Sequence, residues 1–403
     1  MAPRIRRLVG LLILVAATTA AVRWGLSDAD ENLATAPPAA PRPLTLPAYE
    51  RLLAREAGGP IAAAELAQRA SRIAADLEER LSERARLLDP TADDWRTVFA
   101  RLREDTPADD AAVLAAYRDE NARAEAFCRA HDLVPLPPSQ PQVFAIANPS
   151  LRRLFPLAMN RGDGTLGITL APPNPPTPPG GAGLENSPRG AQTTERSFER
   201  RSGGPSGPAP GAAYRRNHCR VCIPPIAVHE SYPGHHVAFA LARAGQAGND
   251  SGRWPFFHEG WAQYAEILLW EEGYWQGDPA REMGALVLLL LRALRAEIDA
   301  RLHGGRLTPE DARRLYTERL LMDTDAAASE VSGHLQHPTK KASYLVGALQ
   351  VLALRDAVAP ARTELRRFHE RLLAHPGYLP ALARDSFGVE IPALPDRPLL
   401  ASP

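Results

Sequence analysis

The sequence AVHESYPGHHVAFA, residues 227–240, begins like the metal-binding helix of a zinc peptidase and then departs from its spacing. In the ordinary motif, histidines four residues apart project from one helical face and share an ion, because a helix turns about 100° per residue. Here the fourth position after His229 holds Pro233, and the next histidines are His235 and His236. A second ligand for the same ion therefore requires a change in the helix between them.

The residues SYPG between these histidines decide which one joins the site. His235 lies about 120° away from His229 around a regular helix, whereas His236 returns to the same face about 10 Å along the axis. Pro233 and Gly234 favour a bulge, because proline removes a helical donor and glycine accepts backbone angles closed to other residues. Read as a two-residue expansion of the turn, the stretch favours His235 over His236 as ligand. The alternative is that a His-Glu pair stands near other histidines by chance.

A second stretch, HEGWAQYAEILLWEE at residues 258–272, predicts an amphipathic helix with Glu259 near its start. A carboxylate on a second helix completes a three-ligand catalytic zinc site and leaves one position open for water. We therefore predict Glu259 as the third ligand of one zinc ion, with Glu230, beside His229, as the general base. The alternative is that Glu259 and Glu266 form the solvated face of a surface helix.

Further downstream, RALRAEIDARLH at residues 292–303 places Arg295, Asp299 and His303 four residues apart on one helical face. Such a line is often only a salt-bridged surface. Opposite a zinc site it can instead orient a ligand through hydrogen bonds or bind substrate. The residues alone leave both readings open.

The stretch KKASYLVG, residues 340–347, holds further candidates. Tyr344 is either a core residue or the donor of a hydrogen bond to a tetrahedral oxyanion, since a neutral phenol stabilises developing charge without ligating a metal. Lys340 and Lys341 are the only lysines among 47 basic residues. They form either an exposed pair on a loop or a cationic site that pairs with a substrate carboxylate.

Five stretches, in order, resemble the bacterial domain-of-unknown-function family 885 (DUF885), which is similar to His-Glu zinc peptidases whose third ligand is glutamate. They are HESYPGHH, EGWAQYAE, RALRAEIDARLH, HPTKKASYLVGALQVLALRDA and FHERLLAHPGYLPAL, and they span about residues 215–393. The resemblance implies a mainly α fold, a helical zinc-peptidase-like arrangement, and it defines the site better than the substrate.

Carried over position by position, the resemblance assigns the zinc-site roles to His229, Glu230, His235 and Glu259. The other recurrent positions, expected to bind substrate or orient ligands, are Arg295, Asp299, His303, Ser343 and Tyr344. One departure stands ahead of the Ser-Tyr pair, where the family usually reads Pro-Gly-Gln-Ala and residues 338–342 read Pro-Thr-Lys-Lys-Ala. Because this stretch leads into the recurrent Ser-Tyr pair, the departure bears on how a substrate is recognised.

The composition of the 403 residues, 45% apolar with a formal net charge of zero, provides for a large core and gives no indication of a nucleic-acid partner. Arginines at positions 4, 6 and 7 precede an apolar run from Leu8 to Val22, which is typical of an export signal. The run is short for a membrane span, which needs about 20 residues, although an uncleaved signal would anchor the protein. We expect an exported protein, periplasmic or extracellular; the sequence does not indicate its oligomeric state.

The rest of the chain divides by composition. Residues 62–88 carry apolar side chains at helical spacing, with no breaker until Pro90, and predict a long helix. QVFAIANP and TLGITL predict short strands beside the cleft, and residues 171–212 predict a loop, either a lid or an insertion. The predicted regions are 1–25, an export signal or signal anchor; 26–47, a disordered tether; 48–140, helices; 141–214, strand-like and Pro/Gly-rich; and 215–395, the metallopeptidase-like helical region.

Cys219 and Cys222 lie in NHCRVCIPP, just ahead of the metal motif. A haem attachment signal would need histidine directly after the second cysteine, where Ile223 stands. In an exported chain we predict a local disulfide that braces the approach to His229, with free thiols as the alternative.

Together these patterns predict a zinc-dependent hydrolase, a metallopeptidase that cleaves peptide or related amide bonds by activating water. Three alternatives stay open: a non-catalytic relative that binds metal or peptide, a zinc hydrolase of a non-peptide amide or ester, and a structural envelope module in which the motifs are fortuitous.

Overall fold

The structure, a computed structural model, describes residues 41–137, 143–146, 158–160, 165–168, 216–244 and 254–401. The elements below belong to the unit Pro43–Pro403. Three predicted segments fall outside the described residues: the export signal 1–25, most of the tether 26–47, and the loop 171–212. Within the described ranges, no helix combines the length and the apolar character needed to cross a bilayer.

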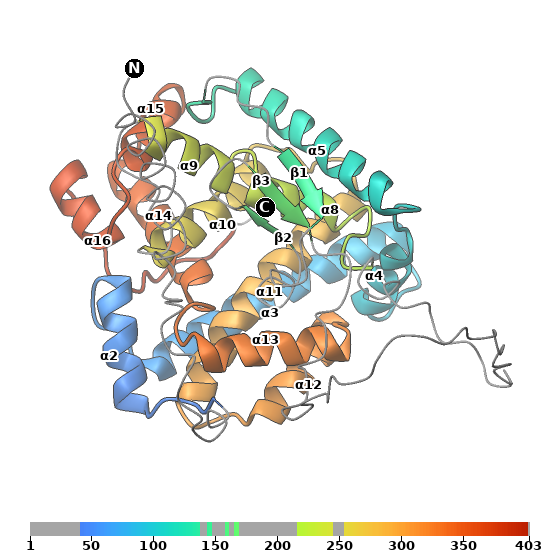
Figure 1. Ribbon diagram of the computed structural model, residues 1–403, viewed down its shortest axis with the longest axis horizontal. Coiled ribbons are helices and arrows are strands. Elements are labelled where there is room, and N and C mark those ends of the chain that lie inside the picture. The colour runs from blue at the N-terminus through green and yellow to red at the C-terminus, as the bar shows by residue number, and fades with distance from the viewer. Residues whose placement is uncertain are drawn as a thin grey trace, which may run out of the picture. The chain divides into compact units, whose positions relative to one another are not determined.

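The fold is mainly helical, which confirms the predicted fold class (Figure 1). The helices before the sheet are α2 Leu46–Ala57, α3 Ala63–Leu88, α4 Trp95–Glu104 and α5 Asp110–Ala130. Those after it are α8 Ile223–Glu230, α9 His235–Ala244, α10 Pro255–Glu271, α11 Pro279–His303, α12 Pro309–Leu320, α13 Thr324–Gln336, α14 Ser343–Val358, η2 Arg362–Glu364, α15 Leu365–Leu373, α16 Leu379–Leu382 and η3 Ala383–Phe387.

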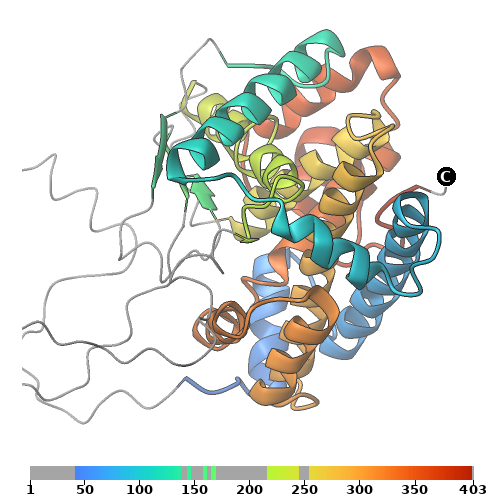
Figure 2. The ribbon, with the colours of Figure 1, turned by 90° about the vertical axis from the view of Figure 1, so that its right-hand side faces the viewer.

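Helix α3 packs lengthwise against α11, and this pair forms the most extensive helix contact of the structure (Figure 2). The apolar positions of α3 face inward, and Leu66, Leu77 and Leu81 are fully buried. Burying each of these leucines stabilises the α3–α11 pair by about 1.5–3 kcal/mol. The apolar face of α3, rather than its charged outer face, therefore holds the two helices together. The predicted helix over residues 62–88 is therefore confirmed, and its role is to support α11.

Helices α10 and α14 cross at a pair of glycines. A Cβ atom on Gly260 would lie 2.5 Å from backbone atoms of Gly347, and one on Gly347 would lie 2.0 Å from the carbonyl oxygen of Phe256. Only glycine at both positions permits this approach. Because Glu259 precedes Gly260 and Tyr344 lies one turn before Gly347, the crossing places both predicted site residues at one junction.

The sheet is small and has the strand order β1-β3-β2. β1 Val143–Ile146 pairs in parallel with β3 Thr165–Ile168, and β2 Ala158–Asn160 pairs antiparallel with β3. β1 and β3 confirm the two predicted strands; the short β2 has no sequence signal of comparable strength. The sheet contacts α5 and α8, so it lies beside the helix that carries His229 (Figure 1).

Candidate metal centre

The His-Glu motif forms two helices rather than one bulged helix, which corrects the sequence reading. α8 ends at Glu230 and α9 begins at His235, with four non-helical residues between them. At this break Gly234 N–H donates to the carbonyl oxygen of Val228 at 3.1 Å. The chain thus folds back on the end of α8, and this reversal brings His235 toward His229.

Glycine is required at position 234 because a side chain there would collide with the backbone of α8. The sequence had instead suggested that glycine supplies an unusual backbone angle. Its φ does not lie in the left-handed region. A Cβ atom there would lie 1.9 Å from the carbonyl oxygen of His229 and 2.5 Å from that of Val228. The indole of Trp261 then fixes the reversed chain by donating to the carbonyl oxygens of Pro233, at 3.0 Å, and Gly234, at 3.2 Å.

Two imidazoles converge on one carboxylate oxygen. Glu259 Oε2 lies 3.5 Å from His229 Nε2 and 3.2 Å from His235 Nε2. The two rings are nearly perpendicular, at 85°, with centroids 4.8 Å apart. Glu230 adds a carboxylate whose oxygen lies within 4.8 Å of the ligand atoms of both histidines. The structure therefore brings together the three predicted metal ligands and the predicted base.

His236 takes no part in this cluster. Its ring packs against Tyr232, with centroids 5.2 Å apart, and burial is the main cause that lowers its pKa. Between the two adjacent histidines, the structure directs His235 toward Glu259, as the sequence favoured.

Behind His229 lies an acidic partner that orients the ring. His229 Nδ1–H donates to Glu266 Oε1 at 2.6 Å, and Arg292 Nη2 lies 3.7 Å from the same oxygen. Burial acts to lower the pKa of His229, as does the charge of Arg292. Hydrogen bonds with Glu259 and Glu266 outweigh both, so this pKa is raised above its ordinary value.

This arrangement contradicts the reading of Glu259 and Glu266 as a solvated face, since their exposed fractions are 8% and 2%. The orienting role of Glu266 was not predicted from the sequence, and Arg292 was not predicted as a site residue at all. The sequence spacing of both residues could have indicated these roles. Glu266 follows Glu259 by two helical turns, and Arg292 precedes Arg295 by one turn on the same helix, so each lies near a residue already singled out.

The second oxygen of Glu259 binds Lys340, whose Nζ lies 2.6 Å from Oε1. Burial acts to raise the pKa of Glu259, but the charge of Lys340 and the hydrogen bonds from His229 and His235 hold it well below the ordinary value. The Lys340 side chain is 39% exposed, so it reaches both the centre and solvent. It contacts the predicted metal ligand directly, which neither sequence reading of the lysine pair anticipated.

Lys341 points elsewhere. Its Nζ lies 2.9 Å from Glu330 Oε2, and the same carboxylate receives two hydrogen bonds from Arg295, at 2.8 and 2.5 Å. Burial, helped by the charge of Arg295, lowers the pKa of Lys341 to about 8. Lys341 is thus part of a largely buried ion cluster with Glu330 and Arg295, which differs from the exposed-loop reading; its role in binding substrate stays a prediction.

Tyr344 lies between His229 and two guanidinium groups. Its ring stacks on that of His229 with centroids 5.7 Å apart, and the guanidinium carbons of Arg292 and Arg295 lie 4.8 and 5.1 Å from its ring centre. Burial and the charge of Glu259 raise its pKa, so the phenol is neutral near pH 7. A partly exposed, neutral phenol beside the histidines agrees with the predicted donor role.

The line of Arg295, Asp299 and His303 is buried, which contradicts the salt-bridged surface reading. His303 Nδ1 accepts from the N–H of Leu44 at 3.0 Å, and its Nε2 lies 3.1 Å from the carbonyl oxygen of His334. Of the three predicted residues, only Arg295 reaches the candidate centre, through the ring of Tyr344.

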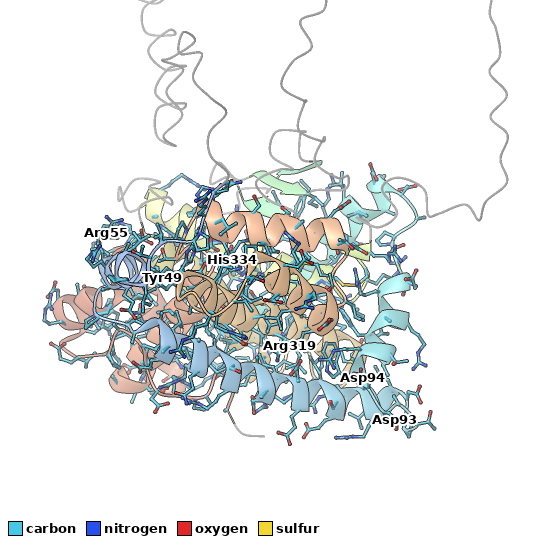
Figure 3. The ribbon with its side chains drawn as sticks, turned by 90° about the horizontal axis from the view of Figure 1, so that it is seen from below. Tyr49, Arg55, Asp93, Asp94, Arg319 and His334 are labelled. Atoms are coloured by element: carbon cyan, nitrogen blue, oxygen red, sulfur yellow. A yellow bond between two sulfur atoms is a disulfide. The ribbon has the colours of Figure 1, made fainter. Side chains whose placement is uncertain are left out.

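Asp299 and Ser343 hold the loop between α13 and α14. Asp299 accepts from Tyr49 Oη at 2.8 Å, from His334 Nδ1 at 2.6 Å and from the N–H of Thr339 at 3.0 Å (Figure 3 labels Tyr49 and His334). Ser343 Oγ donates to the carbonyl oxygen of Lys340 at 2.7 Å. Neither side chain makes a hydrogen bond with His229 or His235; both fix the loop that carries Lys340.

Cys219 and Cys222 form the predicted disulfide immediately before α8, with Cα atoms 4.9 Å apart. A Cβ atom on Gly284 would lie 1.9 Å from the carbonyl oxygen of Val221, so α11 packs directly on this small loop. The disulfide and α11 together fix the start of the helix that ends in His229. Cys128 is buried as a free thiol, and burial raises its pKa to about 12.

The residues that build this centre lie in one contiguous part of the chain. Residues 203–381 match DUF885, a family described as bacterial protein of unknown function. The match includes α8, α9, α10, α11 and most of α14 to α16, and it confirms the family resemblance drawn from the sequence. The DUF885 description names no activity, so the zinc-peptidase similarity stays a prediction. No curated protein matches the chain.

Two solved structures resemble most of this chain. One is a candidate lipoprotein of unknown function from Shewanella oneidensis, with a TM-score of 0.65 and 15% identity; the other is a candidate lipoprotein from Colwellia psychrerythraea, with a TM-score of 0.66 and 18% identity. Each alignment covers 85% of this chain but only 59% and 54%, respectively, of the other. At these identities the likeness shows a shared fold.

Proposed function

We propose that the chain is an exported zinc-dependent hydrolase that cleaves peptide or related amide bonds. One ion would be held by His229, His235 and Glu259. The observation that carries this proposal is the convergence of two imidazole nitrogens on one carboxylate oxygen, at 3.5 and 3.2 Å. The ligand atoms of a tetrahedral ion with bonds of about 2.1 Å lie about 3.4 Å apart, so the residues fit such an ion.

The hydrogen bond behind His229 supports the same assignment. Its Nδ1–H donates to Glu266 and leaves Nε2 facing Glu259 Oε2 at 3.5 Å. Without an ion a proton on Nε2 joins these two atoms, and a bound zinc ion would replace that proton. A carboxylate behind a ligating histidine is also the usual way in which metal sites fix the ring and raise its basicity.

The chain's own residues supply the rest of a hydrolytic site. When bound, the ion would supply positive charge that polarises the scissile carbonyl and makes a water molecule more acidic. Glu230 would take a proton from the attacking water and deliver it to the leaving nitrogen as the C–N bond breaks. Tyr344, neutral and beside His229, would donate a hydrogen bond to the oxygen on which negative charge develops.

Metal analysis of the purified protein beside variants of these residues tests the proposal. We expect about one zinc ion per chain in the wild type and in Glu230→Gln, with hydrolysis of a peptide library lost only in the variant. His229→Ala and Glu259→Ala should lose bound zinc, because each removes one of three protein ligands. Full zinc affinity in Glu259→Ala would overturn the ligand assignment.

Two other outcomes would redirect the function while keeping the metal site. Stoichiometric zinc without turnover of peptide, amide or ester substrates would indicate a non-catalytic relative. Turnover of an ester or a non-peptide amide alone would change the substrate class.

Export is supported by the arginines at positions 4, 6 and 7 before the apolar run Leu8 to Val22, and by the description of the two structural neighbours as candidate lipoproteins.

A further inference from the structure

Lys340 occupies a fixed position at the edge of the candidate centre. Its backbone N–H donates to the carbonyl oxygen of His337 at 3.2 Å, and its own carbonyl oxygen accepts from Ser343 Oγ at 2.7 Å. The preceding residue, Thr339, donates its N–H to Asp299. Little further backbone ordering is needed when this ammonium meets a ligand, so its contact would cost less conformational entropy.

The ammonium has donors to spare. A lysine ammonium carries three N–H donors, and Glu259 Oε1, at 2.6 Å, is the carboxylate that Lys340 contacts. With 39% of the side chain exposed, the remaining donors can face an incoming molecule. The neighbouring cations are less accessible: Arg292 is 4% exposed, Arg295 is 5% exposed, and the Lys341 side chain is 15% exposed.

The charges around the centre favour an anionic group in the substrate. Glu230, Glu259 and Lys340 together carry one negative charge, and the pair of Glu266 and Arg292 behind His229 adds none, so a divalent ion changes the balance of these five groups from negative to positive. The carboxylate of Glu259 would then interact with the ion as well as with Lys340, so it would neutralise less of the positive charge of the Lys340 ammonium. A substrate carboxylate beside Lys340 would restore the balance.

We propose that Lys340 forms a carboxylate subsite, so that the enzyme prefers peptides with a negative charge next to the scissile bond. The inference rests on the proposed function for its ion and for the cleaved bond, but its binding test does not require turnover. The carboxylate is either a free C-terminus or an acidic side chain. The chemistry at Lys340 is the same for both, namely a charge-assisted hydrogen bond to a compact ammonium.

The test measures binding to the zinc-saturated Glu230→Gln protein, which should not hydrolyse its ligand. The probes are N-benzoylglycine and N-benzoylglycinamide, which differ in one group, carboxylate against neutral amide. By titration calorimetry we expect the acid to bind about tenfold more tightly, the lower end for a charge-assisted hydrogen bond at a partly exposed site. Adding Lys340→Gln should remove this preference, and Lys340→Arg should retain part of it.

Arg313→Gln is the matched control, because it removes one positive charge from α12 and Arg313 pairs with Glu310 on that helix. It should leave the preference for the acid unchanged. Equal affinity for the two probes, including no detectable binding of either, overturns the subsite. A preference that survives Lys340→Gln also overturns it, because the ion or another cation then holds the carboxylate. Absence of zinc or of any turnover in the wild type would count against the proposed function instead.

Hydrolysis by the wild type separates the two sources of the carboxylate. We would compare one peptide as free acid, as C-terminal amide, and with an acidic side chain near the cut bond replaced by its amide. A faster reaction of the free acid alone identifies the C-terminus, and a loss only on neutralising the side chain identifies an acidic residue. Either preference should weaken as salt is raised, because Lys340 is partly exposed; equal rates for all three peptides contradict the proposal.

Discussion

Replacing Gly234 by alanine tests how the chain holds His229 and His235 together. The added Cβ atom would lie 1.9 Å from the carbonyl oxygen of His229, so the backbone must open by about 1.1 Å to reach a 3.0 Å contact. Gly234 immediately precedes His235, and the carbonyl that must move belongs to the other ligand. Zinc-ligand distances hold to about 0.2 Å, so a shift of this size should lower zinc affinity by at least the 10–100-fold typical of disturbed outer partners.

The assay is zinc competition against a chromophoric chelator, with thermal unfolding measured in parallel. Gly377→Ala is the control, because a Cβ atom there would meet nothing nearer than the carbonyl oxygen of His375 at 3.9 Å. The control should keep the zinc affinity of the wild type, and Gly234→Val should be at least as impaired as Gly234→Ala. A folded Gly234→Ala protein with wild-type zinc affinity would refute the steric argument.

Three further predictions use the same protein. Glu266→Gln should lower zinc affinity by about 10–100-fold in the chelator assay, because the amide orients His229 less strongly than the carboxylate does. His236→Ala should leave zinc bound, and loss of zinc there would show that His236 is a ligand. Burial lowers the pKa of His369 to about 3, so as pH falls below about 6.5 the unfolded state binds the proton first and stability is lost. By pH 5 this loss is about 2 kcal/mol relative to pH 7 in urea unfolding, and His369→Gln should not show that part of the decrease.

Local patterns in the sequence were sufficient to predict the fold class, the long helix α3 and two of the strands. The spacing of apolar residues predicted α3 and its end before Pro90, because one buried stripe repeats every three to four residues. The strands β1 and β3 followed from short β-favouring runs between breakers. The break at residues 231–234 was predicted at the right place but wrongly as a bulge within one helix. The need for glycine at position 234 comes from the carbonyl oxygen of His229, a neighbour that only the folded chain shows.

What the sequence could not give was contact between distant segments. Three whole helices, α11, α12 and α13, lie between Gly260 and Gly347 in the chain, and nothing local indicates that their backbones touch. Arg292 was passed over because an interval of four residues selected Arg295, Asp299 and His303. Its partner Glu266 lies on another helix. The sequence thus predicted the residues that converge at the candidate centre, but the groups that orient them depend on how α10, α11 and α14 cross.

The contacts of Lys340 show what the departure from the family pattern before Ser343 changes in the candidate centre. Lys340, which stands in that departing stretch, contacts the predicted ligand Glu259 directly. Its loop is held by Asp299, a fully buried carboxylate that accepts hydrogen bonds from α2, α13 and the loop itself. A change at Asp299 should therefore displace Lys340 without touching a ligand of the ion, and its effect should appear first in the choice between acidic and neutral substrates rather than in zinc content.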